Sequence, residues 1–576
     1  VRNIGGLIRG EKAVQITSSN GQVLNESTIY SNATYTNPTA EKSNSFLKIA
    51  VKTNNQGLNK ITEGLKNIGR IESNGQVYID ADSIRNVGGI IAGNEGTYLK
   101  AKTDIEDTSI SLRSLDHNVV EDGRKWDTVD RTVNVSGKIG NGGNTILSAG
   151  RDILLINSDL RASNDIVLNA KRYITSLSVL DTEYRYAQTT ETKKKSFGRK
   201  KTTVKTWIED NEYANGTQMT AGRHILMNYV GTGTDDAQVE QIKNQGIFLQ
   251  GADLLAQGEI VGMSDGNIYT QGTRDKLGSF YEEKTSKSIL GFSYSKSRDT
   301  VDSSQERYKL TQMYSGAGIS YDSEGKLIVE GADIQTAGNL YLRGKQGVYL
   351  LPGTEDGYRR EEHVKEGLTA NFDVGRASVS AGVGYEKNKD TLTEVTTNIV
   401  NNQIQVGGNY YAKSEEGDYT HIATNLLVDG DMKIDAKNIN ILDAQAYRKI
   451  HQTSERTYVG VGVTVGVPIV ESAYQIKDSY EALEGAKGTE GYINGGFQGL
   501  NTYFGAVSAL ANPIGVSGSI TASYSKSEYN REESISVGSN IIVKGSIEFN
   551  GENLHIRGSN LQVGENLTYN ITNDIV

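Results

Sequence analysis

The chain has 576 residues and a net charge of −10, with 65 glycines, 31 tyrosines, 4 prolines and no cysteine. This length exceeds what one compact core usually supports, so we expect several domains or an elongated array of repeats. The missing cysteines exclude disulfides, cysteine-bound zinc and thiol catalysis, and the negative charge argues against a nucleic-acid partner.

The first part of the chain repeats a short motif at a regular interval. Residues 3–27 and 86–109 both open with Asn, an apolar residue, Gly-Gly, another apolar residue and Ile, and continue into an alternating strand and a polar turn. Asn67 begins a similar opening at 67–71. A spacing of roughly 20 residues is typical of one solenoid coil, in which Asn and Gly supply the left-handed conformations of tight turns.

A second motif runs through the rest of the chain. A small residue pair and Asp or Asn precede an apolar residue, and a Gly or Asn turn leads to another apolar residue. The copies are 157–166, 251–260, 331–340 and 558–567, with a weaker fifth copy at 433–442. We interpret them as further coils of the same solenoid.

Each copy is followed by a more divergent stretch that contains strictly alternating strands. Examples are 289–300, 379–391, 457–467 and 520–530. Strict alternation predicts strands with one apolar face, so we expect hairpins that leave the coils. Two interpretations stay open: the apolar faces pack sideways on the solenoid and extend its sheet, or the hairpins pair elsewhere.

One segment departs from the β pattern. Residues 472–511 carry apolar residues at helical spacing, which predicts two short helices inside the longest excursion. An irregular glycine-rich loop is the alternative.

Together these patterns predict an all-β fold, an elongated parallel β-helix with β-hairpin excursions and one short helical insertion. A single coil cannot bury its apolar face, whereas stacked coils can. We divide the chain into residues 1–180, with coils of the Asn-x-Gly-Gly type, and residues 181–576, with coils interrupted by hairpins rich in Gly and Tyr.

Catalytic and metal-binding motifs are not evident. The six histidines are not spaced as metal pairs, and we expect them on turns and hairpins, with no metal, no cofactor and no enzymatic activity. A β-helix polysaccharide lyase is the alternative, because its charged residues would come from different coils. Asp152, Asp159 and Asp165 are candidates for such a cluster, and turn capping is the competing interpretation.

A basic run stands out in this acidic chain. It comprises Lys193, Lys194, Lys195, Arg199, Lys200, Lys201 and Lys205, with Phe197 and Trp207 nearby. It predicts a site for glycans or lipopolysaccharide that carry phosphate or sulfate groups, with Lys193 to Lys201 as the binding residues. The alternative is a solvated hairpin tip.

These two types of coil, followed by alternating hairpins, resemble the repeats of filamentous haemagglutinins and of the exoproteins of contact-dependent growth inhibition. The first type covers about residues 1–180, and the second covers about 140–576 and resembles the second repeat region of that family. The chain begins at Val1 without an apolar leader, so we expect an excised segment of such a protein.

The resemblance implies a protein secreted to the cell surface of a Gram-negative bacterium through an outer-membrane transporter, by two-partner secretion. It further implies adhesion or presentation of a distal toxin, contact with a target-cell glycan, lipopolysaccharide or receptor, and hairpins that enter the target outer membrane. Membrane strands need about 9–11 alternating residues, a length that 377–385 and 459–467 reach.

Overall fold

The computed structural model describes residues 2–11, 13–18, 22–31, 46–51, 65–120, 125–196, 198–229, 244–290, 292–374, 378–466 and 516–576. These residues form three parallel sheets of 14 strands each and one antiparallel sheet of 10 strands. Each coil of the chain contributes one strand to each parallel sheet, which makes a solenoid of 14 coils. The predicted all-β parallel β-helix with hairpin excursions is confirmed. The predicted helices at 472–511 lie outside the described residues.

The strands of the three parallel sheets follow one another along the solenoid. Sheet A contains β1 (Arg2–Asn3), β4 (Val23–Asn25), β7 (Leu65–Asn67), β10 (Ile84–Val87), β13 (Ile105–Thr108), β18 (Asp152–Ile156), β21 (Tyr173–Leu177), β26 (Gly246–Gln250), β29 (Asn267–Gln271), β34 (Lys326–Glu330), β37 (Gly347–Leu351), β42 (Tyr419–Ile422), β45 (Asn438–Leu442) and β50 (Asn553–Ile556). Sheet B contains β2 (Leu7–Gly10), β5 (Thr28–Ser31), β8 (Arg70–Ser73), β11 (Ile90–Gly93), β16 (Gly137–Ile139), β19 (Ser158–Ala162), β24 (Gln218–Ala221), β27 (Asp253–Ala256), β32 (Thr311–Ser315), β35 (Ala332–Thr336), β40 (Asn402–Val406), β43 (Thr424–Val428), β48 (Asn540–Val543) and β51 (Asn560–Val563). Sheet C contains β3 (Ala13–Ser18), β6 (Phe46–Val51), β9 (Gln76–Ala81), β12 (Gly96–Ala101), β17 (Asn144–Ala149), β20 (Ile166–Ala170), β25 (Ile225–Met227), β28 (Ile260–Ser264), β33 (Ile319–Ser323), β36 (Leu340–Gly344), β41 (Tyr410–Lys413), β44 (Met432–Asp435), β49 (Ile547–Gly551) and β52 (Leu567–Ile571).

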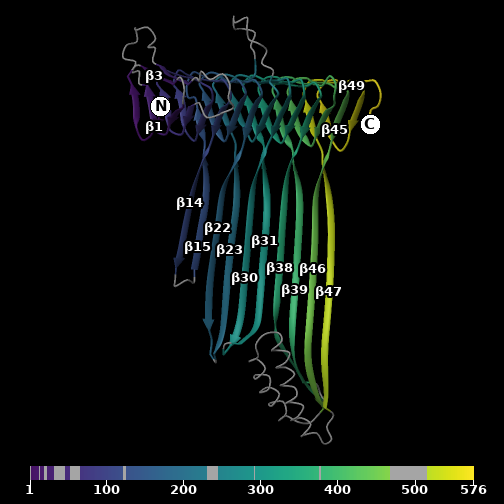
Figure 1. The fold of residues 1–576 in the computed structure, drawn as a ribbon. Helices are drawn as coiled ribbons and strands as arrows, with labels where there is room; N and C mark the ends of the chain where they lie inside the picture. The colour runs from purple at the N-terminus through teal and green to yellow at the C-terminus, as the bar shows by residue number, and fades with distance from the viewer. Residues whose placement is uncertain are drawn as a thin grey trace, which may run out of the picture.

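The antiparallel sheet, which we call the hairpin sheet, projects from one side of the solenoid (Figure 1). Its strands are β14 (Ile110–Val120), β15 (Lys125–Val135), β22 (Val179–Lys194), β23 (Arg199–Asn215), β30 (Thr273–Ile289), β31 (Phe292–Lys309), β38 (Gly353–Val374), β39 (Ser378–Val400), β46 (Ala444–Gly466) and β47 (Val516–Val537). The strands lengthen from 11 residues in β14 to 22 in β47. The hairpins pair with one another rather than with the coils, so the interpretation in which they extend a solenoid sheet is wrong.

All five hairpins leave the solenoid at the corner between sheets A and B. From β13 onward this corner alternates along the chain between a hairpin and a short turn, so one hairpin emerges for every two coils. Stacked coils and neighbouring strands share a spacing of about 4.8 Å. A hairpin is two strands wide and therefore fills the space of two coils. This match of widths lets successive hairpins pair edge to edge into one continuous sheet.

The short turns explain the second sequence motif. Their left-handed residues are Asn157, Gly251, Gly331, Ala423 and Gly558, with φ between 42° and 62°. Four of them begin a predicted copy, but the fifth copy starts at Ala423 and not at residue 433. The segment 433–442 instead joins sheet C to sheet A, so that assignment is wrong. Alanine occupies the left-handed position there, whereas the other four copies have Gly or Asn, and the copy was therefore not recognised from the sequence.

The first motif is explained by a ladder of buried side chains. Asn3, Asn25, Asn67 and Asn86 stack in successive coils of sheet A, and each amide donates a hydrogen bond of 2.7–2.8 Å to the next residue of the ladder. The last acceptor is Asp107. The Gly-Gly pair gives these amides room, because a Cβ at Gly89 would lie 2.6 Å from the side chains of Asn67 and Asn86.

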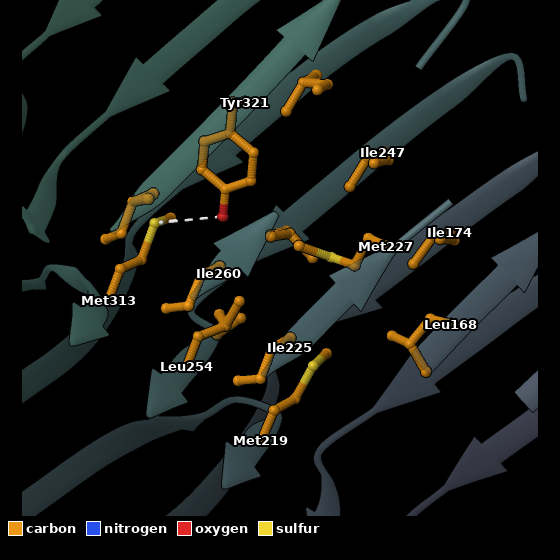
Figure 2. Packing of buried hydrophobic residues seen from close by; sticks show 14 of the residues in the cluster. Leu168, Ile174, Met219, Ile225, Met227, Ile247, Leu254, Ile260, Met313 and Tyr321 are labelled. Atoms are coloured by element: carbon orange, nitrogen blue, oxygen red, sulfur yellow. Dashed lines mark hydrogen bonds between the residues drawn. The ribbon is translucent and has the colours of Figure 1, made fainter. Parts of the chain in front are cut away.

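Apolar side chains fill the solenoid between the three sheets (Figure 2). Met219, Leu254 and Met313 occupy one position in successive coils of sheet B and are 0–1% exposed. The hydroxyl of Tyr321 donates to the sulfur of Met313 at 3.4 Å. Burying such a side chain stabilises the fold by about 1.5–3 kcal/mol, an energy that a coil gains only through its neighbours.

The proposed division between residues 1–180 and 181–576 stays a prediction. The three parallel sheets continue through residue 180 without a break, and the first hairpin, β14–β15, already lies within the first range.

Candidate interaction surface

The hairpin sheet gathers the basic residues that the sequence singled out. The register of β22 and β23 places Lys193 opposite Lys201 and Lys194 opposite Lys200, and the backbone N–H of Lys195 donates to Arg199 at the hairpin tip. All six predicted residues are exposed. Lys193 pairs with Glu191 at 3.1 Å, and the other five make no ion pair within the described ranges. Like charges that face each other across a sheet repel, and an anionic ligand would relieve this repulsion.

The neighbours of this patch are only partly described. Phe197 lies outside the described residues. Trp207 lies further along β23, where its ring packs against Tyr281 with the centroids 5.6 Å apart. Lys205 pairs with Glu283 at 3.4 Å. The structure therefore separates Lys205 and Trp207 from the six exposed basic residues at the end of the β22–β23 hairpin, which we call the basic tip.

The far end of the four longest strands has two unlike faces. Cross-strand registers place Ala370, Val383, Val461 and Ile520 in one row, with similar rows on both sides of it. We call this surface the distal apolar face: Leu368, Ala370 and Phe372 on β38, Ala381, Val383 and Tyr385 on β39, Val459, Val461 and Val463 on β46, and Ile520 and Ala522 on β47. Phe372, Val459 and Ile520 are 59%, 41% and 72% exposed.

The opposite face of the same strands carries mostly small residues, and the ring of Tyr458 lies over Gly384 and Gly460 there. It carries Thr369, Gly382, Gly384, Gly460, Gly462, Ser519 and Thr521. Side chains alternate between the two faces of a strand, so the sequence alternation becomes a sheet with one apolar and one glycine-rich side.

The histidines correct one expectation. His555 on β50 and His421 on β42 lie on solenoid strands and not on turns or hairpins, and His421 is fully buried. Its Nε2 lies 3.3 Å from the carbonyl of Thr424, which can only accept, so Nε2 carries the proton. Nδ1 then accepts from the hydroxyl of Tyr419 at 2.9 Å, and Tyr410 donates to Tyr419 at 2.9 Å. The sequence offered no signal for this network beyond the strand pattern.

The three candidate aspartates lie apart from one another. Asp152 is on β18, Asp159 is on β19, and Asp165 is in the turn before β20, so they belong to different faces of the solenoid. Burial alone would raise the pKa of Asp165, but Arg223 and the backbone N–H of His224 hold this pKa below its ordinary value. Asp152 similarly accepts from Arg172 and from the backbone N–H of Tyr173. These contacts agree with the turn-capping interpretation.

In the described part of the chain, no three His, Asp or Glu side chains gather as ligands for a metal ion. No helix in the same ranges is long and apolar enough to cross a membrane.

Comparisons with known proteins agree with the sequence motifs. The model of a family described as hemagglutinin repeat matches residues 123–206, 290–402, 383–496 and 514–576, which is more than half of the chain. Over 316 residues, the chain is 24% identical to the tRNA nuclease CdiA of Escherichia coli O6:K15:H31 (strain 536 / UPEC). Over 342 residues, it is 23% identical to the 16S rRNA endonuclease CdiA of Enterobacter cloacae subsp. cloacae.

These matches cover 51% and 55% of this chain but only 10% of either relative, so the chain spans about a tenth of their length. No solved structure matches the chain.

Proposed function

Because this chain belongs to the hemagglutinin-repeat family, we propose that it is a structural segment of a secreted exoprotein on the surface of a Gram-negative bacterium. Its similarity to CdiA proteins supports export through a two-partner transporter of the outer membrane and a role in contact with a target cell. The nuclease activities in their names are those of whole proteins, of which the matched part covers only 10%. The repeat match supports a segment without enzymatic activity that holds a distal toxin or receptor-binding part away from the cell.

Within this role the solenoid is the scaffold and the hairpin sheet is the contact surface. The observation that carries this proposal is the distal apolar face, which lies at the far end of the hairpin sheet from the solenoid (Figure 1) and exposes the side chains of Phe372, Val459 and Ile520 to solvent. Exposed contiguous apolar surface is typical of sites that bind a partner or a membrane. The distal apolar face lies against the outer membrane of the target cell, with its apolar side chains in the lipid interface.

Flotation with vesicles that contain lipopolysaccharide tests this contact. The variant Phe372→Ser, Val459→Ser and Ile520→Ser removes three exposed apolar side chains from the face. A control variant, Leu115→Ser, Val119→Ser and Leu255→Ser, removes three exposed apolar side chains elsewhere. We expect the wild type and the control to float with the vesicles and the first variant to stay in the dense fraction. Equal flotation of all three proteins would contradict the proposal.

A further inference from the structure

The hairpin sheet contains a second charged feature, separate from the basic tip. A hollow of about 440 Å³ opens over β23, β30, β31, β38 and β39. Its charged lining consists of Lys284, Lys296, Arg298, Lys387 and Glu366. Four cations and one carboxylate give the lining a net positive charge in a chain whose net charge is −10. Its volume lies within the range of about 300–1,000 Å³ that is usual for small-molecule sites.

The register of the strands builds this hollow. Lys296 on β31, Glu366 on β38 and Lys387 on β39 stand in one row across three neighbouring strands. Lys284 and Arg298 face each other in the row two residues closer to the solenoid. All five side chains therefore lie on the same side of the hairpin sheet as the distal apolar face, because Glu366 lies two residues before Leu368 on β38.

Two of the cations already make ion pairs. Arg298 donates to Glu362, a buried carboxylate that also pairs with Lys389 at 3.3 Å. Lys284 pairs with Glu282 at 2.7 Å.

The other two lysines keep their charges unpaired. Glu366 stands between Lys296 and Lys387, yet its Oε2 accepts from the hydroxyl of Tyr385 at 3.0 Å. Neither lysine makes an ion pair in the described part of the chain. The carboxylate in the same row as both lysines thus accepts from a tyrosine, and both ammonium groups are left available to a ligand.

We infer that this hollow binds a saccharide that carries two phosphate or sulfate groups, one held by Lys296 and the other by Lys387. The two lysines are separated by two strand spacings, about 10 Å, which suits groups on neighbouring sugar rings. The hydroxyls of Thr202 and Ser286 line the same hollow as further donors, and Val204 and Val364 offer an apolar surface to the ring faces. Charge-assisted hydrogen bonds to such groups are about twice as strong as neutral ones. This site does not depend on the proposed membrane contact, because a soluble saccharide suffices to occupy it.

Titration calorimetry with defined anions tests the site on the full chain. The soluble ligands are a disulfated heparin disaccharide and a glucosamine disaccharide with two phosphates. Vesicles of phosphatidylcholine with and without a phosphorylated glycolipid distinguish a free saccharide from a lipid headgroup. The variant is Lys296→Gln with Lys387→Gln, and the rescue variant is Lys296→Arg with Lys387→Arg. The control, Lys100→Gln with Lys171→Gln, removes the same charge from exposed lysines of the solenoid.

We expect the Gln variant to bind the soluble disaccharides about a hundredfold more weakly, about tenfold for each lost contact. The Arg variant and the control should bind as the wild type does. Binding to the glycolipid vesicles alone, still dependent on Lys296 and Lys387, would support the site and assign its ligand to a lipid headgroup. Equal binding by the wild type and the Gln variant in every arm would overturn the inference, as would an equal loss in the control. The variant Phe372→Ser, Val459→Ser and Ile520→Ser, which leaves Tyr385 in place, should keep this binding, and this separates the two proposals.

Discussion

The asparagine ladder ends at a carboxyl group that the solenoid buries completely. Asp107 accepts from Asn86 through Oδ1, and its Oδ2 is buried without a hydrogen-bond partner in the described part of the molecule. In the next coil the equivalent position is Leu155, so the ladder cannot continue. A buried acceptor without a partner is costly, and this cost is lower for a protonated carboxyl than for a carboxylate.

This arrangement predicts an unusual pH dependence at Asp107. Burial raises its pKa to about 7, despite hydrogen bonds from Asn86 and Ser158 that lower it, and nearby Asp159 adds to the increase. The folded chain therefore keeps a proton that the unfolded chain releases above about pH 4, so stability falls as pH rises from about 4 to 7, by about 4 kcal/mol at most.

The substitution Asp107→Asn should remove this loss. Urea unfolding of both proteins at pH 5 and pH 8 measures it. We expect the difference in unfolding free energy, variant minus wild type, to be larger at pH 8 than at pH 5. A difference that is the same at both would show that Asp107 ionises normally.

His421 should produce the opposite slope. Burial lowers its pKa to about 4, so the folded chain keeps it neutral while the unfolded chain takes up a proton below about pH 6.5. Its contribution to stability is complete above pH 6.5 and decreases as pH falls to about 4, by about 3 kcal/mol at most. The substitution His421→Gln should remove this decrease, so the difference in unfolding free energy, variant minus wild type, should be larger at pH 5 than at pH 7.5. A parallel decline of both proteins in urea unfolding would contradict this.

Among the structural elements, the β22–β23 hairpin carries the basic tip, whose binding to anionic glycans can be tested directly. Its residues are placed together by the β22–β23 register, and five of the six have no ion pair within the described ranges. Replacing Lys193, Lys194, Lys195, Lys200 and Lys201 with Gln should lower the salt concentration at which the protein elutes from heparin-like resin. Exposed charges are screened within about 10 Å at 0.1 M salt, so the retention of the wild type should itself fall steeply with salt.

The control for this experiment removes five lysines from the coils. They are Lys66, Lys100, Lys102, Lys171 and Lys437. If the control and the tip variant elute together, retention reports only net charge, and the tip is a solvated turn.

The sequence predicted the coils better than it predicted the hairpin sheet. Local signals mark each coil, because Asn67, Asn86 and the left-handed Gly331 are required at fixed places by turns and by the ladder. Where the local requirement was met by another residue, as at Ala423, the prediction failed. The pairing of β23 with β30 joins strands whose contact depends on the two-coil spacing, and no single segment encodes that spacing.

The hollow that contains Lys296 and Lys387 could not be predicted from the sequence for the same reason. Lys296 and Lys387 are 91 positions apart in the sequence, and only the register through β38 brings them into one row. The basic tip, in contrast, is contiguous in the sequence and was therefore found.

In the whole molecule, the hairpin sheet projects from one side of the solenoid along much of its length (Figure 1). Fourteen coils extend for about 65 Å, and a hairpin strand of 22 residues for about 75 Å. The hairpin sheet is one strand layer thick over most of its area, so the molecule is a thin plate rather than a rod. A plate of this kind exposes two wide faces beside its scaffold, which suits a segment that makes surface contacts.

Small-angle scattering distinguishes this shape from a compact one. From the strand spacing and rise, we expect a radius of gyration of about 35 Å, whereas a globular chain of this length would have about 25 Å. A variant in which each hairpin is replaced by a short turn should keep the solenoid, because the three parallel sheets pair and pack without the hairpin sheet. Its radius of gyration should fall to about 20 Å, and its circular dichroism should remain that of β structure. A wild type near 25 Å would contradict the plate, and a variant without β structure would show that the solenoid needs its hairpins to fold.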